Sequence, residues 1–321
     1  MERAGKAIAS ELLKHYNFNQ KSVLVFCGPG NNGGDGLVIS RILKEKKINT
    51  TTVIAGAKKY SEDFLKNLEK LKLVSDKIYL YKPVASLKSV NPITEEELEN
   101  IIAHSNVELI VDSLLGTGQK SPPKGAIKEI IEIINRSLPN NTQITAVDMP
   151  TGFNTDSGEV YTPHLRANLT VCIELIKKGM FQYPARDICG KIVTVSIGIN
   201  CSKGTSAFIL DQKTAPYLPK RAPWAHKGDF GPSLIIAGSR NMPGASALAA
   251  KAALKAGCSL VTCAYPEKVP ALEQLLIPEV IRAPLPDNNK GYFTEDSLPF
   301  LKNKLANFKS VAVGCGIGSE K

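Results

Sequence analysis

The stretch CGPGNNGGDG, residues 27–36, decides the fold of the first half of this chain. It follows the apolar run VLVF and precedes the apolar run LVISRIL. A glycine-rich turn between a buried strand and a helix is typical of parallel α/β sheets. Gly28, Gly30 and Gly33 match the G-x-G-x-x-G spacing of dinucleotide-binding turns, but the two asparagines and Asp35 go beyond what that turn needs.

Strand-like and helix-like segments alternate from this stretch onward. Strands are expected in SVLVFCG, NTTTVIAG, KIYLY, VELIVDSLLG, QITAV, LTVCIELI and KIVTVSIGI. Helices are expected at the N-terminus, near 35–46, 61–73 and 124–136, and in TEEELENIIAHS, where Thr94 and Glu97 have the spacing of a capping box. The alternation predicts an α/β fold, a Rossmann-like parallel sheet with helices on both faces.

A second α/β pattern follows a segment rich in proline and glycine at 200–232. It contains the strand SLIIAG, the helix GASALAAKAALKAG and the strands SLVTCAY and SVAVGCGIG. We place one domain at 1–202 and a second at 203–321. Because the second pattern stops one loop after a strand, we expect that domain to be incomplete.

The composition excludes several function classes. The chain has 321 residues, of which 43% are hydrophobic, and no run of apolar residues approaches a membrane span. Its seven cysteines are scattered, which argues against a disulfide scaffold and a zinc ribbon. The net charge of +10 suggests anionic partners, but basic runs such as KK at 177–178 are short and predict a solvated surface. We therefore expect a soluble, cytoplasmic protein without nucleic-acid or membrane partners.

Neither of the two standard phosphate-binding motifs is complete. The second strand, TTTVIAGAKK, ends without the acidic residue that an NAD-binding turn places there, which argues against a dehydrogenase. The P-loop pattern G-x-x-x-x-G-K-[ST] does not occur. The stretch still offers a helix N-terminus for an anion and the amide oxygens of Asn31 and Asn32 for a cation. A plain turn with Asp35 as the helix cap is the structural alternative.

Two other strands end in carboxylates. Asp112 follows VELIV and Asp148 follows QITAV. Because the carboxyl ends of parallel strands share one edge of a sheet, we expect both aspartates and the NNGGD turn to meet in one crevice. Each aspartate alone has a second interpretation as a turn residue.

These motifs resemble a known enzyme family. GPGNNGGDGLV, VDSLLGTG and VDMPTG resemble the NAD(P)H-hydrate epimerase domain. HKGDFGPSLIIAGSRNMPGASALAAKAALKAGCSLVT and VGCGIG resemble the start of the ADP-dependent NAD(P)H-hydrate dehydratase domain, which has a ribokinase-like fold. The resemblance implies a bifunctional repair enzyme that recovers hydrated NADH and NADPH, and it leaves a homo-oligomer possible.

The resemblance also implies site residues. The hydrated dinucleotide would bind to Asn31, Asn32, Gly33, Gly34, Asp35, Gly116, Thr117, Gly118, Gln119, Lys120, Ser121, Pro122 and Asp148 in the first half, and to Ala245, Gly316 and Gly318 in the second. K⁺ would bind to Asn32, Asp112 and Thr151, whose hard oxygens suit an alkali cation. Asp148 is the candidate acid/base, because inversion at the hydrated carbon needs one proton delivered and one removed.

Two departures from the family pattern shape the functional prediction. Family members carry a helical segment before MERAG, and their dehydratase domain continues to a G-T-G-D motif that this chain lacks. We therefore expect epimerase activity, with ADP- or ATP-dependent, Mg²⁺-assisted dehydration only in a full-length protein. The alternative is a non-catalytic module that binds nucleotides or proteins on a Rossmann-like fold.

Overall fold

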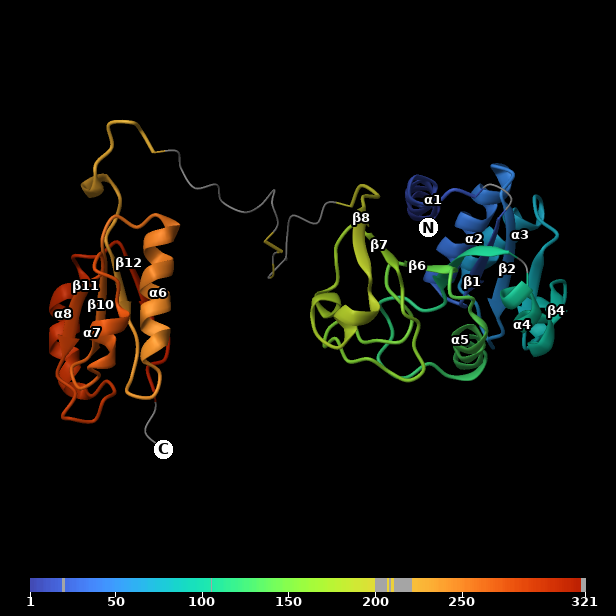
Figure 1. Cartoon of the computed structure of the whole chain (residues 1–321). Coiled ribbons are helices and arrows are strands. Elements are labelled where there is room, and N and C mark those ends of the chain that lie inside the picture. Colours follow the sequence, from blue (N-terminus) through green and yellow to red (C-terminus); the bar gives the residue numbers. More distant parts are fainter. Residues whose placement is uncertain (19–20, 105, 200–206, 208, 211–220, 319–321) are drawn as a thin grey trace. The chain divides into compact units, whose positions relative to one another are not determined.

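The computed structural model describes residues 1–18, 21–104, 106–199, 207, 209–210 and 221–318 (Figure 1). The chain divides into two compact units, Met1–Leu210 and Asp211–Lys321, and each is described by itself. The predicted boundary between residues 202 and 203 lies outside the described residues and stays a prediction.

The first unit contains an eight-stranded parallel sheet with the order β4-β3-β2-β1-β5-β6-β7-β8. The chain moves outward from β1 to β4 and then returns to the other side of β1. The strand order therefore reverses between β1 and β5, which is where open α/β sheets bind their ligands. The strands are β1 (Ser22–Cys27), β2 (Asn49–Ala55), β3 (Ile78–Tyr81), β4 (Asn91–Ile93), β5 (Val107–Ser113), β6 (Gln143–Val147), β7 (Leu169–Ile173) and β8 (Lys191–Val195).

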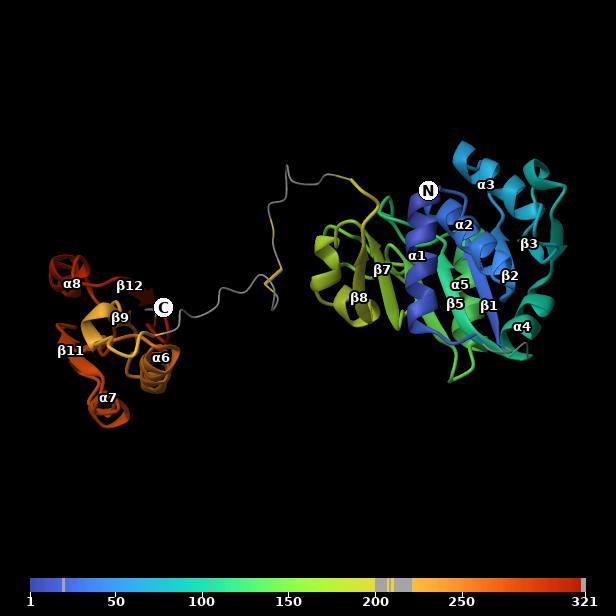
Figure 2. The same ribbon diagram turned by 90° about the horizontal axis from the view of Figure 1, so that it is seen from above.

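Helices cover both faces of this sheet, as Figures 1 and 2 show. Alternate residues of β1 point to opposite faces. Val23 and Val25 join a buried core with α1, α2 and α3, whereas Leu24 and Phe26 join a second core with α4 and α5. The helices are α1 (Glu2–His15), α2 (Asn31–Glu45), α3 (Glu62–Lys72), α4 (Glu95–His104) and α5 (Gly125–Ser137). The predicted fold class is confirmed.

Helix α2 begins four residues before the predicted start, so most of the NNGGDG stretch is helical. Gly30 is the N-cap residue, and Asp35 lies inside the helix, so the interpretation of Asp35 as a cap is wrong. A Cβ atom on Gly33 would lie 1.7 Å from the carbonyl oxygen of Gly28. Glycine is a poor helix former, but here it permits a backbone contact that no side chain allows.

The other local predictions of the first unit differ in outcome. The capping box is present, because the Thr94 amide donates to Glu97 Oε2 (2.8 Å) and the Glu97 amide donates to Thr94 Oγ1 (3.2 Å). Strand β4 was not predicted, since it is short and contains Pro92, which is tolerated at the sheet edge. Short 3₁₀ helices lie at Ala85–Leu87, Lys178–Phe181, Ala185–Ile188, Lys227–Asp229 and Glu295–Ser297.

The second unit contains a four-stranded parallel sheet with the order β11-β10-β9-β12. Its strands are β9 (Ser233–Ile236), β10 (Val261–Pro266), β11 (Ile281–Leu285) and β12 (Ser310–Val313), and its helices are α6 (Pro243–Ala256), α7 (Ala271–Leu275) and α8 (Leu298–Leu305). The predicted β9, α6, β10 and β12 are present, whereas β11, α7 and α8 were not predicted. In the described parts of the chain, no helix has both the length and the apolar character needed to cross a membrane.

The contact between Gly33 and Gly28 leads to a stability prediction. Gly33→Ala should lower the free energy of unfolding of the first unit by roughly 2–3 kcal/mol, because the added methyl group forces α2 away from β1. Helix propensity alone predicts the opposite sign. Urea unfolding measures the effect. The control is Gly118→Ala, whose Cβ has no neighbour within 4 Å, and equal stability of the two variants would contradict the prediction.

Candidate active site

A pocket of about 470 Å³ lies at the carboxyl ends of β1, β5 and β6. It occupies the point where the strand order reverses. The first turn of α2 and the segment after β5 form most of its wall, and Asp148 follows β6 directly. The lining residues are Pro29, Gly30, Asn31, Asn32, Asp35, Leu114, Leu115, Gly116, Thr117, Gly118, Gln119, Asp148 and Ile173.

The structure brings many of the predicted substrate-binding residues together in this pocket. Those that line it are Asn31, Asn32, Asp35, Gly116, Thr117, Gly118, Gln119 and Asp148. Gly33 and Gly34 do not line it, because they face the packing contacts of α2 with Gly28 and Met1. Lys120, Ser121 and Pro122 lie just beyond the lining, although Gln119 Nε2 donates to the carbonyl of Ser121 (3.2 Å).

Asp112 and Thr151 form a buried pair beneath the pocket. Thr151 donates to the Asp112 carboxylate twice, from its hydroxyl to Oδ1 and from its amide to Oδ2, both at 2.7 Å. The Leu114 amide donates to Oδ1 at 3.2 Å. Complete burial raises the pKa of Asp112 to about 6, and these three hydrogen bonds act in the opposite direction.

The predicted third cation ligand, Asn32, connects to this pair through Leu115. Asn32 Nδ2 donates to the Leu115 carbonyl (2.9 Å), and the Leu115 amide donates to Thr151 Oγ1 (3.1 Å). The three predicted ligands thus belong to one chain of hydrogen bonds. The Asp112 carboxylate, the Thr151 hydroxyl and the Leu115 carbonyl supply hard oxygens of the kind that an alkali cation binds, whereas Asn32 turns its Nδ2 towards the Leu115 carbonyl.

Asp148 is held in a strained backbone conformation at the pocket edge. Its φ is +67°, a region that residues other than glycine rarely adopt. Its Oδ1 accepts the Ile173 amide (2.9 Å) and forms an ion pair with Lys177 Nζ. The Asp148 side chain is only 13% exposed, and the Lys177 side chain is only 17% exposed. The carboxylate is therefore fixed by groups from β7 and the loop after it.

Lys177 is the residue of this site that the sequence interpretation missed. The KK run at 177–178 was expected on a solvated surface, but the Lys177 ammonium is largely buried against Asp148. The sequence feature that could have identified Lys177 as a site residue is its position just after β7, at the carboxyl edge of the sheet.

Asp35 is a second carboxyl in the same pocket. The residue is 7% exposed, and its Oδ1 has no hydrogen-bond partner. The amino group of Met1 lies 3.8 Å from Oδ1. Burial raises the pKa of Asp35 to about 7; the nearby Asp148 adds to this increase, and the Met1 amino group opposes it.

The predicted residues of the second unit also lie together. A Cβ atom on Gly316 would be 2.8 Å from the Ala245 side chain, and one on Gly318 would be 3.2 Å from Ser239. Both glycines have positive φ, +70° and +77°. His226 Nδ1 accepts the Gly228 amide (3.0 Å) and caps the 3₁₀ helix Lys227–Asp229.

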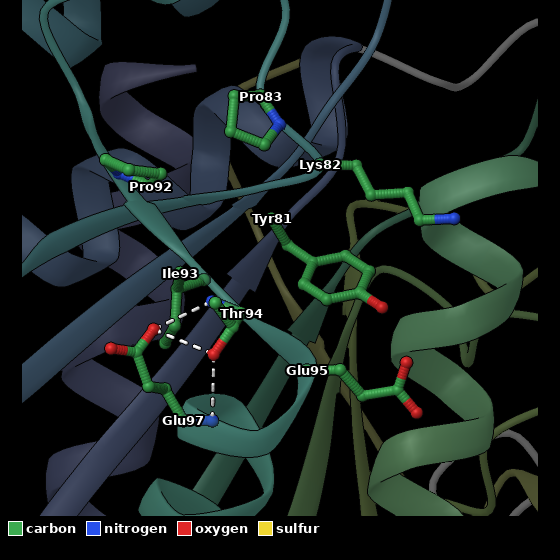
Figure 3. Close-up of a pocket in the computed structure, with 8 residues that line it drawn as sticks. All are labelled: Tyr81, Lys82, Pro83, Pro92, Ile93, Thr94, Glu95 and Glu97. Atoms are coloured by element: carbon green, nitrogen blue, oxygen red, sulfur yellow. Dashed lines mark hydrogen bonds between the residues drawn. The ribbon is translucent and has the colours of Figure 1, made fainter.

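A second pocket, of about 560 Å³, lies beyond β3 and β4 (Figure 3). Its polar side chains serve the fold. Thr94 and Glu97 form the capping box of α4, and Lys82 forms an ion pair with Glu129 of α5. Tyr81 also donates to Glu129 (3.1 Å). This pocket brings none of the predicted site residues together.

Comparison with known families assigns the first unit to one of them. Residues 1–179 match the family described as YjeF-related protein N-terminus. The chain belongs to this family. Residues 233–321 match the family described as NAD(P)H-hydrate dehydratase. Both halves of the resemblance read from the sequence are therefore confirmed at the level of family.

Curated relatives of this chain share one name. "Bifunctional NAD(P)H-hydrate repair enzyme Nnr" of Moorella thermoacetica is 31% identical over 100% of this chain and 59% of its own length. The proteins of that name from Methanothermobacter thermautotrophicus and Coxiella burnetii are 33% and 36% identical over 100% and 84% of this chain. The chain spans 52–60% of the length of such relatives. A crystal structure of yeast ynu0 has a TM-score of 0.49 and 23% identity, and the match covers 61% of this chain and 76% of that one.

The Asp112–Thr151 pair leads to a second stability prediction. Thr151→Val should lower the free energy of unfolding by about 1–3 kcal/mol, because it removes a hydrogen bond from a buried carboxylate and the acceptor of the Leu115 amide. Urea unfolding of the first unit measures this loss. Thr51→Val in β2 is the matched control, and a loss no larger than in the control would refute the structural role of the Thr151 hydroxyl.

Proposed function

We propose that the first unit interconverts the R and S forms of hydrated NADH and NADPH. The observation that carries the proposal is the Asp148–Lys177 ion pair at the edge of the switch-point pocket. A largely enclosed carboxylate held in one orientation beside a ligand pocket is well placed for proton transfer. The relatives named NAD(P)H-hydrate repair enzymes support the choice of substrate.

The pocket wall suits the dinucleotide part of this substrate. The backbone amides at the start of α2, around Gly30 and Asn31, favour the phosphate groups. The segment from Gly116 to Gln119 forms the facing wall, and we propose that Lys120, Ser121 and Pro122 extend it towards the rest of the ligand. Gly33 and Gly34 would contribute their backbone and the close packing of α2.

The chemistry needs one group that gives and one that takes a proton. The hydrate carries its hydroxyl group on a carbon bonded to the ring nitrogen. Its configuration inverts when that hydroxyl leaves and returns, or when the ring opens and closes. Asp148 is the proposed acid/base in either route.

We further propose that K⁺ binds to Asn32, Asp112 and Thr151. The support is the chain of hydrogen bonds that brings these residues together through Leu115. A bound cation would offset the charge of the buried Asp112 carboxylate and of the substrate phosphates.

The second unit matches the family described as NAD(P)H-hydrate dehydratase, and its role is proposed from that match alone. We propose that Ala245, Gly316 and Gly318 contact the S hydrate in a dehydration that uses ADP or ATP and Mg²⁺. The cytoplasmic location and a homo-oligomer stay predictions. A non-catalytic binding module gives no reason for the Asp148–Lys177 pair and is the weaker alternative.

The role of Asp148 can be tested directly. Asp148→Asn should lower kcat for conversion of R hydrate to S hydrate by roughly 100-fold or more, because the amide cannot exchange a proton. Chromatography of the two epimers, corrected for the spontaneous rate, measures the conversion. Asp156→Asn, an exposed aspartate in the same unit, should keep wild-type kcat. If Asp148→Asn also keeps it, another group performs the proton transfer.

The cation site can be tested without activity. The melting temperature of the first unit should be higher in potassium chloride than in choline chloride of equal ionic strength, because a ligand that binds only the folded state stabilises it. The gain is about 2.7 kcal/mol when K⁺ is present at about a hundred times its Kd. Thr151→Val should remove the difference and Thr51→Val should keep it. Identical melting of the wild type in both salts would disprove the site.

A further inference from the structure

Asp35 is a buried acid that has no hydrogen-bond partner for one of its oxygens. Its Oδ1 is shielded from solvent, and Asp35 lines the pocket from within α2. A carboxyl group in this position is costly to bury unless it binds a ligand or keeps its proton. The Met1 amino group lies 3.8 Å from Oδ1, beyond hydrogen-bonding distance, and Gly30 rather than Asp35 caps the helix.

Asp148 has the opposite environment in the same pocket. It accepts the Ile173 amide and is paired with the Lys177 ammonium. The pKa of Asp35 is raised by burial and, to a smaller extent, by the charge of Asp148. Two neighbouring carboxyl groups in such different environments separate into one acid and one base.

We infer that Asp35 is a second catalytic carboxyl group, which protonates the departing hydroxyl of the hydrate while the Asp148 carboxylate serves as the base for its return. This inference rests on the proposed epimerase function. It gives Asp35 a chemical role beyond contact with the substrate.

The protons and electrons balance over one inversion. Asp35 gives its proton to the hydroxyl oxygen, the C–O bond breaks, and the ring nitrogen supplies its electron pair to form a C=N⁺ bond as water leaves. A water molecule then adds to the opposite face, the C=N⁺ electrons return to nitrogen, and the released proton goes to Asp148. The pair ends with Asp35 ionised and Asp148 protonated, which is the starting state for the reverse reaction.

The test measures inversion and oxygen exchange in ¹⁸O-labelled water, starting from each separated epimer. In the wild type, each inversion should incorporate one ¹⁸O atom. Asp35→Asn should lower kcat for inversion by roughly 100-fold, with little change in KM, because the amide has a similar shape but no proton to give. In one epimer, the Asp35→Asn variant should still exchange oxygen without inversion, through Asp148. In the other epimer, the Asp148→Asn variant should still exchange oxygen without inversion, through Asp35.

Other outcomes separate the possible failures. A wild-type chain that does not accelerate inversion overturns the proposed function and this inference together. An active wild type with near-normal kcat in Asp35→Asn, or with a raised KM alone, overturns only the role of Asp35. Loss of oxygen exchange in both epimers of Asp35→Asn indicates a structural role, and inversion without ¹⁸O uptake overturns the hydroxyl-loss step.

Two controls guard against a folding defect. Asp76→Asn, an exposed aspartate of the same unit, should keep both activities. Asp35→Ala should be rescued by added formate in a concentration-dependent manner, because a small acid can occupy the space of the missing carboxyl group. A well-folded Asp35→Ala that is fully active without formate contradicts the inference.

Discussion

The hydrogen bonds between Asp112 and Thr151 hold together two strand ends on which the pocket depends. Asp112 lies near the end of β5, and Thr151 lies three residues after Asp148 in the loop that follows β6. The Thr151 hydroxyl also accepts the Leu115 amide, which fixes the start of the segment that lines the pocket. Because the Asp112 carboxylate is fully buried, these bonds cannot be replaced by water. The position of Asp148 follows from the same constraint.

Close backbone contacts of glycine hold the opposite wall. Gly28 leaves no room for a Cβ atom next to the Leu114 carbonyl, and Gly33 leaves none next to Gly28. These contacts place the first turn of α2 against the end of β5. The amides at the N-terminus of α2 and the segment after β5 therefore face one another across a pocket, at the point where strand order reverses.

Much of the fold could be predicted because strongly buried strands are short apolar runs, and their alternation with helices predicts a parallel sheet. Asp112 and Asp148 lie at the ends of adjacent strands, at the same edge of that sheet, as predicted, but only Asp148 lines the pocket, and Asp112 is buried against Thr151. The start of α2 could not be predicted, since helix propensity argues against Gly33 and the contact with Gly28 is tertiary. Lys177 was missed for a similar reason. Its burial depends on a partner 29 positions away, and two adjacent lysines are typical of a surface.

The charge balance of the pocket connects the cation and the two carboxyl groups. A dinucleotide brings negative phosphates to a region that already contains Asp35, Asp112 and Asp148. Two like charges about 4 Å apart repel by about 4 kcal/mol near a protein surface, so an uncompensated set of these groups would oppose binding. Lys177 neutralises Asp148, and a cation at Asp112 would neutralise the second acid. A proton on Asp35 would remove the third charge, which the Met1 amino group 3.8 Å away offsets only in part. On this argument the proton that makes Asp35 an acid also allows an anionic substrate to bind, so catalysis and recognition depend on the same protonation state.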